Sequence, residues 1–232
     1  MNFSEILDNI IKMFKTNSYR ISEKGVLMGV SKSLQYAVIP SNVTEIAKGA
    51  FSFSNVKSVV IPEGVKKIGE KAFECCSELE QVTFPKEMRE IGHSAFVGCH
   101  KLKDVVLPKG IKRIANNTFY ECSHINTVFI PEGVTEIGGS AFSCCGISSI
   151  IIPLSVEVIG GTAFANSHTP DYNGDVVINY RGSQEQWDAI EKGDIEITEI
   201  RNSNGEVVDS EIVEYPFKEP RFCRYNFNYS EE

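Results

Sequence analysis

The chain has 232 residues, of which 42% are apolar, and a formal net charge of −8 at pH 7. This acidic balance argues against a nucleic-acid backbone or an anionic membrane surface as the main partner. No apolar run approaches the roughly 20 residues that a membrane span requires, so we expect no membrane span.

The N-terminal segment, residues 1–33, is predicted to be a cap made of an amphipathic helix and a short hairpin. The hairpin is expected over residues 19–30, around Glu23-Lys24-Gly25. A membrane-surface helix is the alternative, but its polar face is not basic enough for anionic lipid. Glu5 and Asp8 stand where a secretory signal would be basic, which favours a cytoplasmic location. The apolar stripe of the helix has helical spacing: Phe3, Ile6, Leu7, Ile10, Ile11 and Phe14.

Residues 34–167 form an internal repeat with a period of 22 or 23 residues. Six prolines mark the units: Pro40, Pro62, Pro85, Pro108, Pro131 and Pro153. An isoleucine follows each proline by six residues: Ile46, Ile68, Ile91, Ile114, Ile137 and Ile159. A phenylalanine follows each by eleven: Phe51, Phe73, Phe96, Phe119, Phe142 and Phe164. Such a period, with one short apolar strand per unit, predicts a solenoid.

Each unit divides into three parts. The first is a strand that ends at the proline, which cannot donate a ladder hydrogen bond. The second is a turn and another short extended segment, such as 133–138, with Val134 and Ile137 inward. The third is predicted to be a helical turn, such as 139–145, that places Ala141 and Phe142 in the core.

The repeat decays after Phe164. Residues 168–192 are predicted to hold a turn-rich insertion, a last strand at 176–180, and a cap helix. Ser183-Gln-Glu-Gln186 is typical of a capping box, and the helix carries Trp187, the only tryptophan. Residues 193–232 predict a hairpin with an Asn-Gly turn at 202–205, followed by an aromatic tail from Tyr215 that either packs along the solenoid or binds a partner.

The units resemble leucine-rich repeats of the BspA type, also called the Treponema pallidum type. The family pattern joins L-x-x-V-x-I-P, V-T-x-I-G and A-F-x-x-C, and residues 131–145 match it almost letter for letter (Pro-Glu-Gly-Val-Thr-Glu-Ile-Gly-Gly-Ser-Ala-Phe-Ser-Cys-Cys). The resemblance implies an α/β leucine-rich repeat fold, a right-handed curved solenoid of about six coils used for binding. Known family members at the cell surface bind host or bacterial proteins, so a surface or secreted location is the alternative to the cytoplasm.

Four cysteines stand fourteen residues after a proline: Cys76, Cys99, Cys122 and Cys145. Equivalent positions in stacked coils form a ladder, whereas zinc needs ligands that converge, so we expect buried, reduced thiols and no metal. The other cysteines, Cys75, Cys144 and Cys223, are expected to be more exposed and reactive. The four histidines show no nucleophile spacing, and no phosphate loop or dinucleotide fingerprint occurs. We therefore expect neither catalysis nor a cofactor.

Two outward columns bear on binding. Five residues after each proline the charge alternates in sign, which predicts a ladder of ion pairs: Glu45, Lys67, Glu90, Arg113 and Glu136. Two residues before each proline an apolar column faces outward: Val38, Val60, Thr83, Val106, Phe129 and Ile151. A polar rim lies beside it: Lys57, Glu80 and Lys103, then Ser58, Gln81 and Asp104.

The apolar column has three interpretations: a partner surface, a surface covered by the aromatic tail, or β-branched residues that merely suit a sheet. We favour a non-enzymatic scaffold that binds a protein or peptide through this column and the rim residues Lys57, Glu80 and Lys103. The alternatives are an adhesin that binds a host protein or glycan, and a spacer that presents the tail. The sequence leaves the oligomeric state open.

Overall fold

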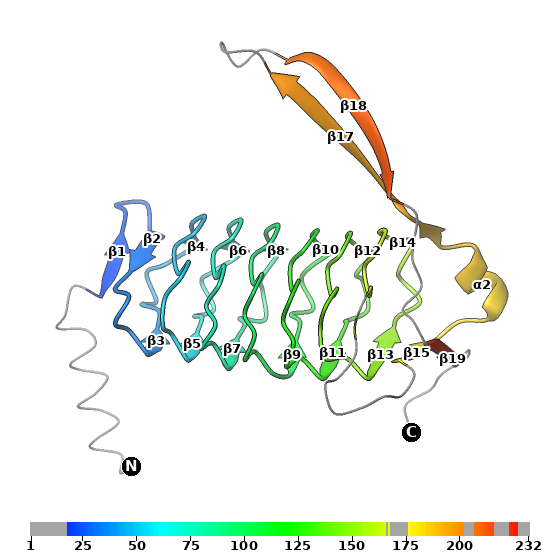
Figure 1. Cartoon of the computed structure of the whole chain (residues 1–232). Coiled ribbons are helices and arrows are strands. Elements are labelled where there is room, and N and C mark those ends of the chain that lie inside the picture. The colour runs from blue at the N-terminus through cyan, green and yellow to red at the C-terminus, as the bar shows by residue number, and fades with distance from the viewer. Residues whose placement is uncertain (1–17, 166, 168–175, 202–206, 216–222, 227–232) are drawn as a thin grey trace.

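The computed structural model describes residues 18–165, 167, 176–201, 207–215 and 223–226. Its coils lie side by side in one row, with a hairpin at the N-terminal end and a short helix at the other (Figure 1). The helix predicted for residues 1–14 and the predicted insertion at 168–174 lie outside the described residues. We number the coils 1 to 6 by their prolines, from Pro40 to Pro153.

Each coil contributes two short strands. The main strands precede the prolines: β3 (Tyr36–Val38), β5 (Ser58–Val60), β7 (Gln81–Thr83), β9 (Val105–Val106), β11 (Thr127–Phe129) and β13 (Ser149–Ile152). The second strands follow them: β4 (Glu45–Ile46), β6 (Lys67–Ile68), β8 (Glu90–Ile91), β10 (Arg113–Ile114), β12 (Glu136–Ile137) and β14 (Val158–Ile159). All pair in parallel with the next coil wherever they pair. The result is the predicted right-handed solenoid of about six coils.

The core is a set of stacked columns that run the length of the array. The six phenylalanines of the repeat are fully buried, and neighbouring rings stack with centroids 4.6 to 6.0 Å apart. Ala141, Phe142, Val134 and Ile137 are buried as predicted. The free energy gained on burial is roughly proportional to the apolar area removed from water. No single coil could bury these rings alone, so the stacking of coils stabilises the fold.

The helical turn predicted for each coil is wrong, and so is the α/β class for the described array. Residues 69–79 show the reason. Ala72, Glu74, Cys76 and Leu79 donate their N–H groups three residues back along the chain, whereas the alternating donors, such as Phe73, bond the next coil. With every second N–H used between coils, no α-helical i→i−4 ladder forms. The segment is a run of linked β-turns.

These turns require left-handed backbone at two fixed places in each coil. Residues nine and thirteen after the proline have positive φ in every coil where they are described: Gly49, Phe53, Lys71, Cys75, Ser94, Gly98, Asn117, Glu121, Ser140, Cys144 and Thr162. Only two of these are glycines, although positive φ at the third turn position favours glycine. The hydrogen bonds between coils offset this backbone cost.

The ends of the array are closed by added strands. At the N-terminal end, β1 (Tyr19–Ile21) and β2 (Val26–Val30) form the predicted hairpin, and β2 extends the second row by pairing with β4. At the C-terminal end, β15 (Val176–Tyr180) pairs with β13, and β16 (Glu191–Lys192) pairs with β14.

Helix α2 (Gln184–Asp188) joins β15 to β16 and has the predicted capping box at Ser183 and Gln186. The buried Trp187 contacts the Tyr180 ring edge-on at 5.4 Å and lies 5.1 Å from the Lys192 ammonium. The predicted C-terminal hairpin is formed by β17 (Asp194–Arg201) and β18 (Val207–Tyr215), which project from the array (Figure 1).

The described part of the tail, β19 (Cys223–Asn226), is the last strand of the main row, paired in parallel with β15. An open sheet edge invites unwanted pairing, and β19 covers the edge of β15. This part of the tail therefore lies at the end of the main row, beside β15.

Both rows are interrupted between coil 3 and coil 4. The main row splits into β3-β5-β7 and β9-β11-β13-β15-β19, and the second row into β1-β2-β4-β6-β8 and β10-β12-β14-β16. Coil 3 carries Phe84 and Met88 where other coils have smaller aliphatic residues, and Phe84 packs edge-on against Phe96 at 5.8 Å. The interruption therefore lies directly after the coil with the larger side chains, as expected if the close-packed interior transmits added volume.

Candidate protein-interaction surface

The main row presents the predicted apolar column to solvent. Val59 and Ile61 point into the core, whereas Val60 between them is 43% exposed, as the period of two along a strand requires. Val38, Val60 and Thr83 stand in register in the first part of the row. Val106, Phe129 and Ile151 stand in register in the second.

The six predicted positions are not equally exposed. Val106 and Phe129 are 65% and 49% exposed, Thr83 is exposed and polar, and Val38 and Ile151 are half-buried. The column therefore has two apolar sections, separated by Thr83 and by the interruption between β7 and β9. Phe129 lies between Val106 and Ile151 in register.

The predicted polar rim comes together around a shallow pocket. Lys57, Glu80 and Lys103, with Ser58, Gln81 and Asp104, line a volume of about 330 Å³. Tyr36 also lines it and is 59% exposed. Tyr36 is not among the candidates predicted from the sequence, although it stands four residues before Pro40, in the column of Ser58, Gln81 and Asp104.

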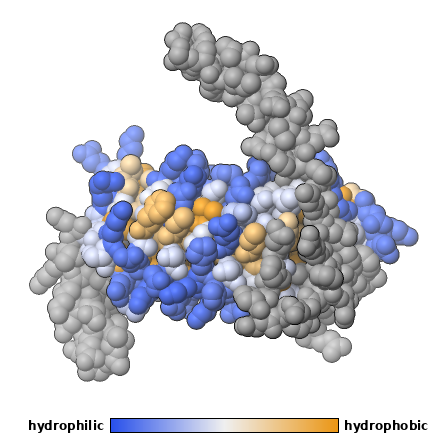
Figure 2. All heavy atoms as spheres, in the orientation of Figure 1, coloured by the Kyte–Doolittle hydropathy of each residue, from blue (hydrophilic) through white to orange (hydrophobic). Residues whose placement is uncertain are grey.

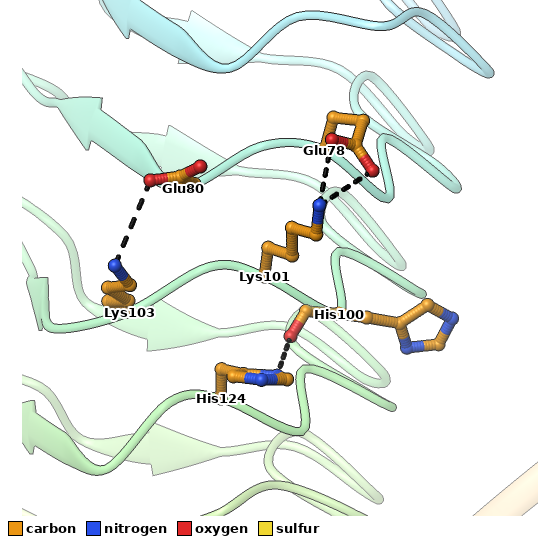
Figure 3. A network of polar contacts seen from close by, with 6 residues as sticks. All are labelled: Glu78, Glu80, His100, Lys101, Lys103 and His124. Carbon is orange, nitrogen blue, oxygen red and sulfur yellow. Dashed lines mark hydrogen bonds and ion pairs between the residues drawn. The ribbon is translucent and has the colours of Figure 1, made fainter.

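Ion pairs join coil 3 to coil 4 along this rim (Figure 3). The Lys103 ammonium lies 3.8 Å from the Glu80 carboxylate, and Lys101 contacts Glu78 at 2.8 Å. The Lys101 ammonium lowers the pKa of Glu78, and the carboxylate raises the pKa of Lys101. Exposed ion pairs stabilise little, so their main effect is to fix the charge pattern of the rim.

The predicted charge ladder forms in part. Lys67 pairs with Glu90 at 3.2 Å, and Arg113 pairs with Glu136 at 2.9 Å. Between Glu90 and Arg113, where coils 3 and 4 part, no ion pair is found.

The cysteine column is structural. The thiols of Cys76, Cys99, Cys122 and Cys145 each donate to the carbonyl oxygen of the buried phenylalanine of the preceding coil, at 3.0 to 3.1 Å. Ser167 makes the same bond to Phe142 at 2.7 Å, which explains why serine can stand in this column. Burial raises the pKa of Cys99, Cys122 and Cys145. The thiols of Cys99, Cys122 and Cys145 are therefore buried and neutral, whereas the hydrogen bond with Cys99 lowers the pKa of Cys76.

The described thiols outside the column and the described histidines make separate contacts near the surface. Cys75 is exposed as predicted, and Cys144 is half-buried, but desolvation and the Glu74 charge raise the pKa of Cys75. His100 Nδ1 bonds the Glu121 carbonyl, and His124 Nδ1 bonds the His100 carbonyl at 2.6 Å (Figure 3). Within the described residues, no three metal-ligating side chains converge, and no helix is both long and apolar enough to span a membrane.

The chain is similar in sequence to the family described as BspA type Leucine rich repeat region, whose profile matches six copies over residues 44–170. A Treponema pallidum leucine-rich repeat protein aligns with a TM-score of 0.59 at 27% identity, over 70% of this chain and 81% of its own. A Bacteroides ovatus leucine-rich repeat protein aligns with a TM-score of 0.57 at 27% identity, over 71% of this chain. This chain spans only 44% of the Bacteroides ovatus protein.

A leucine rich cell surface protein from Faecalibacterium prausnitzii shares the fold, with a TM-score of 0.54 at 23% identity, over 87% of this chain and 60% of its own. No curated protein matches the chain.

Proposed function

Since the chain belongs to the BspA-type leucine-rich repeat family, we propose that it is a non-enzymatic scaffold that binds a protein or peptide on its main row of strands. The observation that supports this most is the exposed section formed by Val106 and Phe129. Aromatic side chains at the centre of a contact dominate interface energies, and Phe129 is held in place by paired strands on both sides.

The surroundings of this section fit a protein interface. An apolar centre with a polar rim is the usual arrangement, and the predicted rim of Lys57, Glu80 and Lys103 lies in coils 2 to 4 and reaches this section at Lys103. Figure 2 shows one face of the array, where apolar areas are small and hydrophilic residues surround them.

The position of β19 bears on the interpretation that the tail covers the column. Strand β19 pairs with β15 at the end of the main row. A tail segment that covered the apolar column would therefore have to come from another part of the tail. This favours an external partner.

The cell-surface alternative has one support. The Faecalibacterium prausnitzii protein, which shares the fold at 23% identity, is described as a cell surface protein. We therefore propose the cell surface as the second location in which to search for the partner.

Capture from a lysate and from a cell-surface extract of the source organism tests the proposal, followed by affinity measurement with the captured protein. Phe129→Asp is expected to weaken binding at least tenfold and leave the fold intact. The matched control is Phe53→Asp, which changes an aromatic residue of similar exposure, 59%, in the turn segment. Full retention of binding by Phe129→Asp would rule out this surface.

A further inference from the structure

The main row carries a shallow pocket in its first four coils, on the N-terminal side of Phe129. The pocket has a volume of about 330 Å³, at the lower end of the size range of ligand sites, about 300–1,000 Å³. Two columns of outward residues line it, one four residues and the other five residues before the prolines. The first column is Tyr36, Ser58, Gln81 and Asp104, and the second is Lys57, Glu80 and Lys103.

The backbone holds these columns in fixed positions. The first three residues of the first column stand in register on the paired parallel strands β3, β5 and β7. In the second column, the Glu80 N–H donates to the Lys57 carbonyl at 2.8 Å, and the Lys103 N–H donates to the Glu80 carbonyl at 3.3 Å. The hydrogen bonds of this column therefore continue from coil 3 to coil 4, although strands β7 and β9 do not pair.

Most of the polar side chains in the pocket have no partner in the protein. Among the lining residues, all of which are described, Glu80 and Lys103 form the one ion pair, at 3.8 Å (Figure 3). Within the part of the chain that the structure describes, the other five lining side chains make no hydrogen bond and no ion pair. They are Tyr36, Lys57, Ser58, Gln81 and Asp104. Their donors and acceptors are free to bind a ligand.

These groups suit an uncharged ligand with many hydroxyls. The lining holds two lysines and two carboxylates, so its formal charges sum to zero. An ammonium group only donates hydrogen bonds and a carboxylate only accepts them, whereas Ser58 and Gln81 do both. An ionic ligand would meet a like charge beside each opposite charge. A sugar hydroxyl can donate to a carboxylate and accept from an ammonium group, so a sugar can use both kinds of lining residue.

Tyr36 supplies the apolar contact for such a ligand. It is 59% exposed and lies at the coil 1 end of the pocket. The face of a tyrosine ring is apolar and its hydroxyl is polar, and a pyranose ring has a similar division between a C–H face and a border of hydroxyls. A sugar can therefore pack on the ring while its hydroxyls remain hydrogen-bonded.

We propose that this coil 1–4 pocket binds a neutral oligosaccharide in extended form. One sugar packs on Tyr36, and the following sugars bond the polar groups of coils 2, 3 and 4. Paired strands lie about 4.8 Å apart, which is close to the advance per sugar of an extended β-1,4-linked chain. Each further sugar therefore meets the same two columns one coil along.

This site is separate from the proposed protein contact. Val106 and Phe129 do not line the pocket, although the predicted rim residues Lys57, Glu80 and Lys103 do. The proposal goes beyond protein binding and does not depend on it. Phe129→Asp is expected to leave the affinity for the oligosaccharide within twofold, so failure of one proposal can be told from failure of the other.

The experiment is an NMR titration of the isotope-labelled full chain with cellotetraose, a neutral β-1,4-linked tetrasaccharide. Tyr36→Ala is expected to weaken binding at least tenfold because the ring is lost, and Tyr36→Phe to change it less than threefold. Asp104→Ala is expected to weaken it at least threefold. The matched controls lie outside the pocket: Phe53→Ala removes an aromatic side chain of the same exposure, and Glu87→Ala removes an exposed carboxylate. Both should stay within twofold of the wild type.

Two further measurements test the class of ligand. Maltotetraose, whose α-linked chain is curved, should bind at least tenfold more weakly, and added sodium chloride should leave the affinity for cellotetraose unchanged because the ligand is neutral. The proposal is overturned if cellotetraose does not bind, if maltotetraose binds as tightly, or if Phe53→Ala weakens binding as much as Tyr36→Ala. If cellotetraose does not bind and Tyr36→Ala weakens binding of a captured protein instead, the pocket belongs to the protein interface. Thermal unfolding of each variant checks that the fold is retained.

Discussion

At the scale of single residues, the cysteine column shows how the repeat uses a small polar group inside its core. Each thiol fills a buried position and donates to a phenylalanine carbonyl that also accepts a backbone N–H from its own coil. The Phe96 carbonyl, for example, accepts the Cys99 N–H and the Cys122 thiol. The position therefore needs a small side chain with one donor. Cysteine satisfies both needs, and serine satisfies them at Ser167, whereas the buried Ser54 of coil 1 contacts the Cys76 thiol.

Substitution of Cys122 tests this role. Cys122→Ser is expected to lower the free energy of unfolding by less than about 1 kcal/mol, because a hydroxyl can make the same bond. Cys122→Ala is expected to lower it by about 1–2 kcal/mol, since it loses the hydrogen bond and the buried sulfur. Urea unfolding measures both, with the exposed Cys75→Ser as the control. Equal costs for serine and alanine at position 122 would show that the hydrogen bond contributes nothing.

The buried thiols also predict a dependence of stability on alkaline pH. Burial raises the pKa of Cys99, Cys122 and Cys145 above the ordinary value of 9.0, so above that pH the unfolded thiols ionise while the folded ones stay protonated. The stabilising contribution is complete below pH 9 and falls as the pH rises further, by up to about 1.4 kcal/mol per pH unit and thiol. Burial raises the pKa of Tyr19 to about 12, which adds a smaller loss above pH 10.

Urea unfolding at pH 7.5 and pH 10 measures this effect. A variant with serine at positions 99, 122 and 145 should lose less free energy of unfolding between the two pH values than the wild type. Serine does not ionise in this range, so the variant lacks the three thiols whose ionisation favours the unfolded state. An identical loss in both proteins would contradict the assignment of the effect to the column.

At the scale of elements, the sequence predicts the strands and core columns well, and the turns poorly. Columns such as Ile46 to Ile159 are visible in the sequence because each coil repeats the same inward position. Residues 139–145 were predicted to be helical since their apolar spacing fits one helical turn equally well. The hydrogen bonds that make the segment a run of β-turns cross to the neighbouring coil, as from Phe119 to Ala141, and no local pattern encodes them.

The left-handed turn positions can be tested at Glu121, an exposed residue with φ of 61°. Glu121→Gly is expected to raise the free energy of unfolding by up to about 1 kcal/mol, because glycine adopts this conformation without a β-carbon clash. Glu121→Ala should have little effect, and Glu121→Val should be destabilising. Destabilisation by glycine would show that the turn is not strained. Thermal unfolding ranks the three variants.

The interruption between coils 3 and 4 was not predictable either. The packing of the larger side chains Phe84 and Met88 inside coil 3, and the positions of nearby charges such as Glu90 and Arg113, are properties of the folded coil that the repeat pattern does not contain. A repeat pattern treats all coils as equivalent. The interruption shows that the coils are not equivalent.

In the molecule as a whole, the described array carries added strands on its second row at the N-terminal end and on both rows at the C-terminal end, and the outward face of its main row stays open. The candidate surface could be predicted from the sequence because strand alternation fixes which residues point outward. Its unequal exposure could not, since Val38 and Ile151 owe their burial to neighbours outside their own coil.

The tail provides a test at this scale. Truncation after Tyr215 removes β19 and uncovers the edge of β15, so we expect lower thermal stability and a tendency to associate through that edge. Binding through Phe129 should persist, because β11 lies two strands away from β15 in the row. Analytical ultracentrifugation and affinity measurement distinguish these effects. Loss of partner binding with unchanged association would instead make the tail the binding element.

The central claim is that a partner contacts the main row at Phe129. The most direct measurement is site-specific photo-cross-linking in cells of the source organism, with a benzoyl-phenylalanine placed at position 129 in one strain and at position 53 in another. We expect a discrete cross-linked partner from position 129 and none from position 53, although both side chains are similarly exposed. The same cross-links from both positions, or cross-links from position 53 alone, would contradict it.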